Sequence, residues 1–147
     1  MSDSGDLRRV AGGVMAAQRF CVLATAGQGQ PYGSLVAFAA TEDLKELVFA
    51  TSRRTRKFSN LAAEPRVALV IDSRSNDEAD LRDAVAITAL GPAREVEGAE
   101  RKRLAGVYLA RHPLLAEFIG WPDTALCAVK VEEYFVARFS EVDRMLP

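Results

Sequence analysis

The sequence has 147 residues, 49% of them apolar, with 19 basic and 20 acidic side chains and one histidine. This length fits one globular domain over residues 1–147 and excludes a second full domain. The net charge of −1 gives no general attraction to nucleic acid, so any local group of cations is expected to serve a small anionic ligand. No apolar run is long enough for a bilayer, and the N-terminus is polar, which predicts a cytoplasmic protein without a membrane partner.

A helix is predicted first, because Leu7, Val10, Ala11 and Val14 recur at helical spacing; it should end near Gln18. Apolar segments bounded by turn residues then predict the strands of a mainly β fold. The expected strands are Phe20–Thr25, Tyr32–Thr41, Glu46–Thr51, Arg66–Ile71, Ala84–Val96 with a bend at Gly91–Pro92, and one or two within Ala125–Phe139.

Helices are predicted at two further places. A short amphipathic helix should follow Thr55, and a longer pattern from Gly98 should be broken by Pro113. The charged segment Ser73–Asp83 is interpreted as a solvated surface loop and not as a metal site, because it lacks a glycine-anchored ligand repeat.

The runs LVAFAA and VALVI do not alternate between apolar and polar residues, as a half-solvated antiparallel strand should. Both faces of these strands are therefore expected to be buried. In a small barrel the inner face fills the core, and helices or a second subunit must cover the outer face. This pattern predicts a homodimer.

A cluster of cations lies at the predicted start of the helix after Thr55, where the helix dipole is already positive. The cations are Arg53, Arg54, Arg56 and Lys57, and the hydroxyls of Thr51, Ser52 and Thr55 lie among them. A bound anion would relieve the repulsion and accept from the free N–H groups. The cluster therefore predicts a phosphate site, with a solvated helix start as the alternative.

The segment ATSRRTRKFSNLAAEPRVALVID, with its TRKxxNLxxxPRVxL arrangement, resembles the pyridoxamine 5'-phosphate oxidase-like, FMN-binding split-barrel family. The resemblance is good from Phe20 to Val96 and looser in the C-terminal third. It implies an α+β fold, namely a six-stranded antiparallel split β-barrel with flanking helices. It also implies FMN held at a homodimer interface and oxidoreductase activity on a small-molecule substrate.

The resemblance also assigns residues to the flavin. The strand Tyr32–Phe38 would give backbone hydrogen bonds to the isoalloxazine ring, and the helix start would hold the phosphate. The residues so assigned are Ser34, Leu35 and Val36 for the ring, Thr51 and Ser52 near the ribityl and phosphate, and Thr55, Arg56 and Lys57 for the phosphate grip. No catalytic residue is assigned.

The chain departs from the oxidase itself at several points. Ser34 and Ala39 stand where the oxidase carries an Arg and a Lys, and the strand Ala84–Leu90 lacks the Gln that touches flavin. A substrate phosphate would lack its cationic partners, so oxidation of vitamin B6 is not expected. The remaining classes are a flavin oxidoreductase, a non-catalytic flavin or ligand sensor, and a haem protein on the same fold.

The haem alternative depends on His112, because the segment Tyr108–Pro113 resembles a region of split-barrel relatives that bind or degrade haem. The simpler interpretation of His112 is a cation at the end of a helix. Three aromatic residues are expected either near the flavin edge or in the core, namely Trp121, Tyr134 and Phe135. Cys21 and Cys127 are interpreted as buried, inert thiols, and with one histidine and no GxSxG turn a nucleophilic triad is not expected.

Overall fold

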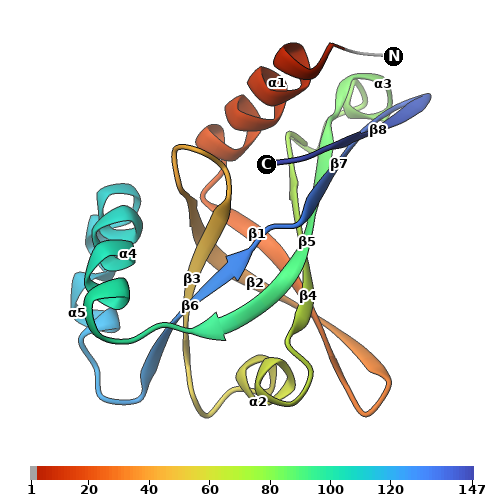
Figure 1. Cartoon of the computed structure of the whole chain (residues 1–147). Helices are drawn as coiled ribbons and strands as arrows, with labels where there is room; N and C mark the ends of the chain where they lie inside the picture. The colour runs from red at the N-terminus through yellow and green to blue at the C-terminus, as the bar shows by residue number, and fades with distance from the viewer. Residues whose placement is uncertain (1–2) are drawn as a thin grey trace.

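The computed structural model describes residues 3–147, and Figure 1 shows a β-barrel with helices around it. The strands are β1 (Phe20–Gly27), β2 (Gln30–Ala40), β3 (Glu46–Ser52), β4 (Arg66–Asp72), β5 (Ala86–Glu95), β6 (Thr124–Lys130), β7 (Glu133–Arg138) and β8 (Glu141–Met145). The helices are α1 (Ser4–Ala17), α2 (Arg56–Ala63), α3 (Asp80–Asp83), α4 (Gly98–Arg111), the 3-10 turn η1 (Pro113–Leu115) and α5 (Ala116–Ile119).

The barrel closes through six antiparallel strands in the order β4-β1-β2-β3-β6-β5, because β4 also pairs with β5. The predicted six-stranded split barrel is therefore confirmed. Two strands, β7 and β8, extend the sheet beyond β5. The prediction missed β8, and it treated the segment that contains the short helix α3 as a loop.

Two strands cross from one half of the barrel to the other. Strand β2 pairs with β1 over residues 30–37 and with β3 only over residues 38–40. Strand β5 pairs with β4 up to Pro92 and with β6 from Ala93 onward. The predicted bend at Gly91–Pro92 is this crossing point. A Cβ on Gly91 would lie 2.0 Å from the backbone oxygen of Lys130, so only glycine allows the two strands to approach.

The core has two parts. The barrel interior is filled from alternate positions of the strands and is closed at one end by Leu7, Ala11 and Met15 of α1. A second apolar cluster lies between the barrel and α4, where Leu104 and Tyr108 pack on β3 and β6. Because helices cover their outer face, β3 and β6 are buried on both sides.

Within one chain, the outer faces of β2 and β4 are only partly covered. The VALVI run of β4 alternates between buried and half-buried residues. In the LVAFAA run, Leu35 is 65% exposed while Val36 and Phe38 are buried. Helix α4 covers the outer face at β3 and β6, whereas the outer face of β1, β4 and most of β2 stays open in the single chain.

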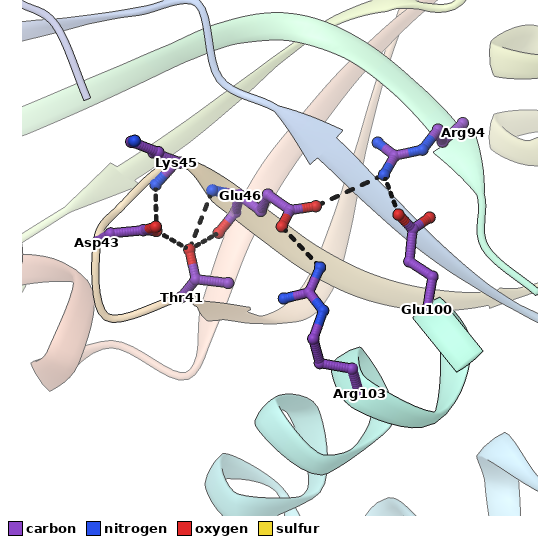
Figure 2. Close-up of polar contacts among 7 residues, drawn as sticks. All are labelled: Thr41, Asp43, Lys45, Glu46, Arg94, Glu100 and Arg103. Carbon is purple, nitrogen blue, oxygen red and sulfur yellow. Dashed lines mark hydrogen bonds and ion pairs between the residues drawn. The ribbon is translucent and has the colours of Figure 1, made fainter.

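Ion pairs join α4 to residues near the ends of β3 and β5, as Figure 2 shows. The carboxylate of Glu46 on β3 accepts from Arg103 of α4 at 3.0 Å and lies 3.6 Å from Arg94 of β5. Arg94 in turn donates to Glu100 of α4 at 2.8 Å. The network joins two strands and one helix, although exposed pairs of this kind each contribute little to stability.

Replacing Gly91 with Ala should destabilise the fold, because the new methyl group would meet the backbone of Lys130 and the crossing strands would have to separate. We expect a loss of about 1–3 kcal/mol, the usual scale for overpacking a core. Gly106→Ala is the matched control, since a Cβ there has nothing within 4 Å and Ala favours the α4 helix by about 0.5–1 kcal/mol. Chemical denaturation measures both; equal stability of the two variants would contradict the argument.

Candidate functional site

The turn between β3 and α2 is built by its own hydroxyl groups. The Oγ1 atom of Thr55 caps α2 by accepting from the Phe58 N–H at 3.3 Å, and its proton goes to the Ser52 carbonyl at 2.9 Å. The buried hydroxyl of Thr51 lies 2.9 Å from that of Thr55. Thr51 and Thr55 therefore shape the turn, and of the three predicted hydroxyl donors only that of Ser52 keeps a proton without an acceptor among residues 3–147.

The four clustered cations divide into two pairs. Arg53 donates to Glu95 at 3.1 Å through Nε and to the Pro122 carbonyl at 2.7 Å, and Arg54 lies 3.0 Å from Asp123. The hydrogen bond with Glu95 raises the pKa of Arg53 above its usual value. These two side chains are therefore neutralised on the side of the turn that faces β6.

Arg56 and Lys57 form the other pair. Neither has a carboxylate partner within the described part of the chain. Their backbone N–H groups, at the first two positions of α2, also have no hydrogen-bond partner there, since the Thr55 cap serves only Phe58. Two side-chain charges and two backbone donors are thus available together to an anion.

The strand that was predicted to lie along the flavin has an open edge. Over residues 30–37, β2 pairs with β1 alone, because β3 separates from it beyond the pair Phe38–Phe49. If the pairing of β2 with β3 continued, Val36 would lie opposite Thr51. The gap where the two strands separate therefore lies between β2 and the turn that follows β3. The guanidinium of Arg56 lies over the ring of Tyr32, 4.8 Å from its centroid, and connects the two sides.

The three residues predicted to contact the flavin ring lie on this open stretch of β2 with different orientations. Ser34 is half-buried and its hydroxyl donates to the Leu23 carbonyl at 3.4 Å. Leu35 points outward, and Val36 points into the barrel core. Any contact of residues 34–36 with a ligand at the strand edge is therefore expected to come from their backbone groups.

His112 ends α4 and is buried, at 6% exposure. Its Nε2 atom lies 2.6 Å from the Phe38 carbonyl, which can only accept, and its ring packs against Tyr108. The bond to β2, and not a solvated cation at the helix end, accounts for its position. Tyr134 lies in the core and donates to the Leu44 carbonyl at 2.7 Å, whereas Trp121 is exposed and stacks edge-on against Phe118.

Two negative findings concern other kinds of site. Among residues 3–147, no group of three or more His, Cys, Asp or Glu side chains is arranged to hold a metal ion. The helices within the same range are all too short or too polar to cross a membrane.

The family model described as pyridoxamine 5'-phosphate oxidase matches residues 12–137, so the chain belongs to this family. A search of curated proteins finds no significant match. Three solved structures show the same fold at low identity. A haem-binding protein from Mycobacterium smegmatis is 21% identical with a TM-score of 0.83, and the alignment covers 99% of this chain and 59% of that one.

The second solved structure is an FAD-binding protein from Mesorhizobium loti, 20% identical with a TM-score of 0.67, covering 86% of this chain and 88% of that one. A protein of the pyridoxinephosphate oxidase family from Clostridium acetobutylicum is 14% identical with a TM-score of 0.76, covering 99% and 96%. At these identities the likeness establishes the fold. The chain spans only about three fifths, 59%, of the Mycobacterium protein.

Sequence reasoning missed three residues that shape the site. Tyr32 was predicted only as the start of a strand, and Glu95 and Asp123 were not connected with the cations that they neutralise. Glu95 and Arg53 are brought together by closure of the barrel, so no local pattern reveals the pair. Tyr32 could have been recognised as an aromatic residue on the predicted flavin strand itself.

The two cysteines should be unreactive in the folded protein. Burial raises the pKa of both Cys21 and Cys127 from 9.0 to about 12, so at pH 8 both thiols stay protonated. We expect a disulfide reagent such as DTNB to release no chromophore from native protein and to titrate both thiols in denaturant. Because the pKa of both thiols is higher in the folded protein than in the unfolded one, the free energy of unfolding also depends on pH. The contribution of the two thiols to it is complete below pH 9.0 and is lost as the pH rises toward 12. Rapid labelling of the native protein would contradict the burial.

Proposed function

We propose that the protein binds FMN, with the phosphate at the start of α2 and the isoalloxazine ring along the open edge of β2. The observation that carries the proposal is the division of the four cations. Arg53 and Arg54 are neutralised, while Arg56, Lys57 and their backbone N–H groups remain available at one point. A phosphate dianion satisfies all of these donors, and membership of the oxidase family supports a flavin as its carrier.

In this proposal the chain contributes binding and orientation. Arg56 and Lys57 would hold the phosphate, Ser52 would donate to it or to the ribityl chain, and unpaired backbone groups of residues 34–36 would meet the ring edge. FMN supplies the redox chemistry when bound. No acid or base of this chain is assigned a proton-transfer step. The proposed activity is therefore that of a flavin-dependent oxidoreductase acting on a small molecule.

Pyridoxine and pyridoxamine phosphates are not proposed as substrates. Ser34 donates to a backbone carbonyl and Ala39 is buried on β2, so neither position supplies the cation that a second phosphate would need. The haem alternative has less support, even though one neighbour of similar fold is a haem-binding protein. His112, the single histidine of the sequence, is buried, and its Nε2 atom is bonded to the Phe38 carbonyl.

A homodimer is proposed on the evidence of the open sheet face. The strand registers align two rows of outward residues across β2, β1, β4, β5, β7 and β8, and both rows are mainly apolar. One row is Leu35, Val22, Val70, Thr88, Phe135 and Arg144, and the other contains Ala37, Phe20, Asp72, Ala86, Ala137 and Val142. Phe20, Leu35 and Val142 are 55%, 65% and 64% exposed. A continuous apolar face of this kind favours a partner, and a second copy would cover both faces at once.

FMN should bind more tightly than riboflavin, because only FMN carries the phosphate. Replacing Arg56 and Lys57 together with Ala should weaken FMN roughly tenfold or more per residue, as expected for charge-assisted bonds, and leave riboflavin affinity nearly unchanged. Flavin fluorescence titration measures both affinities. The matched control is the variant with Arg53 and Arg54 replaced by Ala, which removes two cations that are already paired.

Unchanged melting of the Arg56/Lys57 variant would show that the fold is intact. If FMN and riboflavin bind the wild-type protein equally well, the phosphate site is wrong. A strong absorption band after reconstitution with haem, combined with no flavin binding, would favour the haem alternative.

The dimer should dissociate when a charge is placed on the apolar sheet face. Leu35→Asp should give a monomer at micromolar concentration in analytical ultracentrifugation, whereas Leu114→Asp, at a residue that is 95% exposed on η1, should not. If the flavin site is complete only in the dimer, FMN should tighten the wild-type dimer by mass action. A wild-type monomer would refute the dimer, and a dimer constant indifferent to FMN would place the site within one subunit.

A further inference from the structure

One buried polar side chain of α2 has no role in the proposal above. Asn60 lies one turn after Arg56 and Lys57 and is 8% exposed. Its Nδ2 atom donates to the hydroxyl of Thr25 on β1 at 3.0 Å, and Thr25 is itself buried. A buried amide on a helix surface is costly unless it is bonded, so this contact fixes where α2 lies on the barrel.

The Asn60 side chain also lies close to the backbone of the β1–β2 hairpin at Gly27. A Cβ built on Gly27 would lie 2.2 Å from the Asn60 Oδ1 atom. Gly27 ends β1 in ordinary extended backbone and pairs with Gln30, so its conformation does not itself require glycine. The close approach of the Asn60 side chain leaves no room for a Cβ at this position.

From Thr25 the contact continues to β2. The Thr25 hydroxyl donates to the Tyr32 carbonyl at 3.5 Å, and the Arg56 guanidinium lies over the Tyr32 ring at 4.8 Å. Tyr32 is two residues before Ser34, on the stretch of β2 whose other edge is open. Asn60 and Arg56, both on α2, thus hold the same part of the hairpin from two directions.

We propose that Asn60 is a positioning residue that sets the spacing between the anion-binding start of α2 and the open edge of β2, and thereby makes the site selective for a phosphorylated flavin. The inference rests on the proposed function. The ribityl chain fixes the distance between ring and phosphate, and hydrogen bonds are lost when donor and acceptor move apart by about 1 Å. A shift of α2 on the hairpin should therefore cost phosphate recognition while ring contacts along β2 persist.

The first experiment compares FMN and riboflavin affinities in three variants. Asn60→Ala and Thr25→Val each remove one side of the contact, and Thr25→Val keeps the side-chain shape if Asn60→Ala folds poorly. Both should weaken FMN about tenfold and riboflavin less than about twofold. Ser59→Ala, the exposed neighbour on α2, is the control and should change neither affinity. Equal loss for both flavins, or no loss, would overturn the inference.

The second experiment needs no flavin. Gly27→Ala should lower the melting temperature of the otherwise wild-type protein, because the new methyl group meets Asn60, and should have little further effect in Asn60→Ala. Additive losses would show that the two residues do not touch, and would overturn the positioning role. If the wild-type protein binds neither flavin, both the proposed function and the selectivity fail, while non-additive melting would still establish the contact by itself.

Discussion

The site depends on the point where β2 leaves β1 and joins β3. Three hydrogen bonds hold the backbone there. The Phe38 N–H donates to Arg19, the Phe38 carbonyl accepts from His112, and the Ala37 carbonyl accepts from Tyr108 at 3.3 Å. Because β3 joins only after this point, the preceding stretch of β2 keeps one edge unpaired. An unpaired edge is normally a liability in a sheet, and here it lies beside the turn that carries Arg56 and Lys57.

Two of the four positive charges at that turn are paired with carboxylates. Four cations on five consecutive residues give a broad positive potential, but Glu95 and Asp123 cancel the two that face β6. The two remaining charges, on Arg56 and Lys57, lie at the start of α2 together with two free backbone N–H groups. In the proposed function, such an arrangement would favour a compact phosphate over a general polyanion, in agreement with the overall net charge of −1.

Local patterns were enough to predict much of this molecule. The barrel strands, the Gly91–Pro92 bend and the start of α2 follow from apolar runs, turn residues and the Thr55 cap, all of which act over a few residues. The ion partners of Arg53 and Arg54 could not be predicted, because they depend on barrel closure. Strand β8 was missed because its sequence, EVDRM, is mostly polar and buries only Met145. Whether a helix or a second subunit covers the outer face of β4 could not be predicted, because apolar composition does not reveal what lies on that face.

The pairing of β3 with β6 has a consequence for the order of events during synthesis. The hairpins β1–β2 and β7–β8 and the pair β4–β5 join segments close in the chain, but Glu46 of β3 must wait for Lys130 of β6. Contacts so distant in sequence form late, after the entropy of a long loop has been lost. The end of β3, from which the candidate phosphate turn begins, is therefore secured only after β6 has been synthesised. A ligand bound at this turn would consequently stabilise a late step of folding and not the early hairpins.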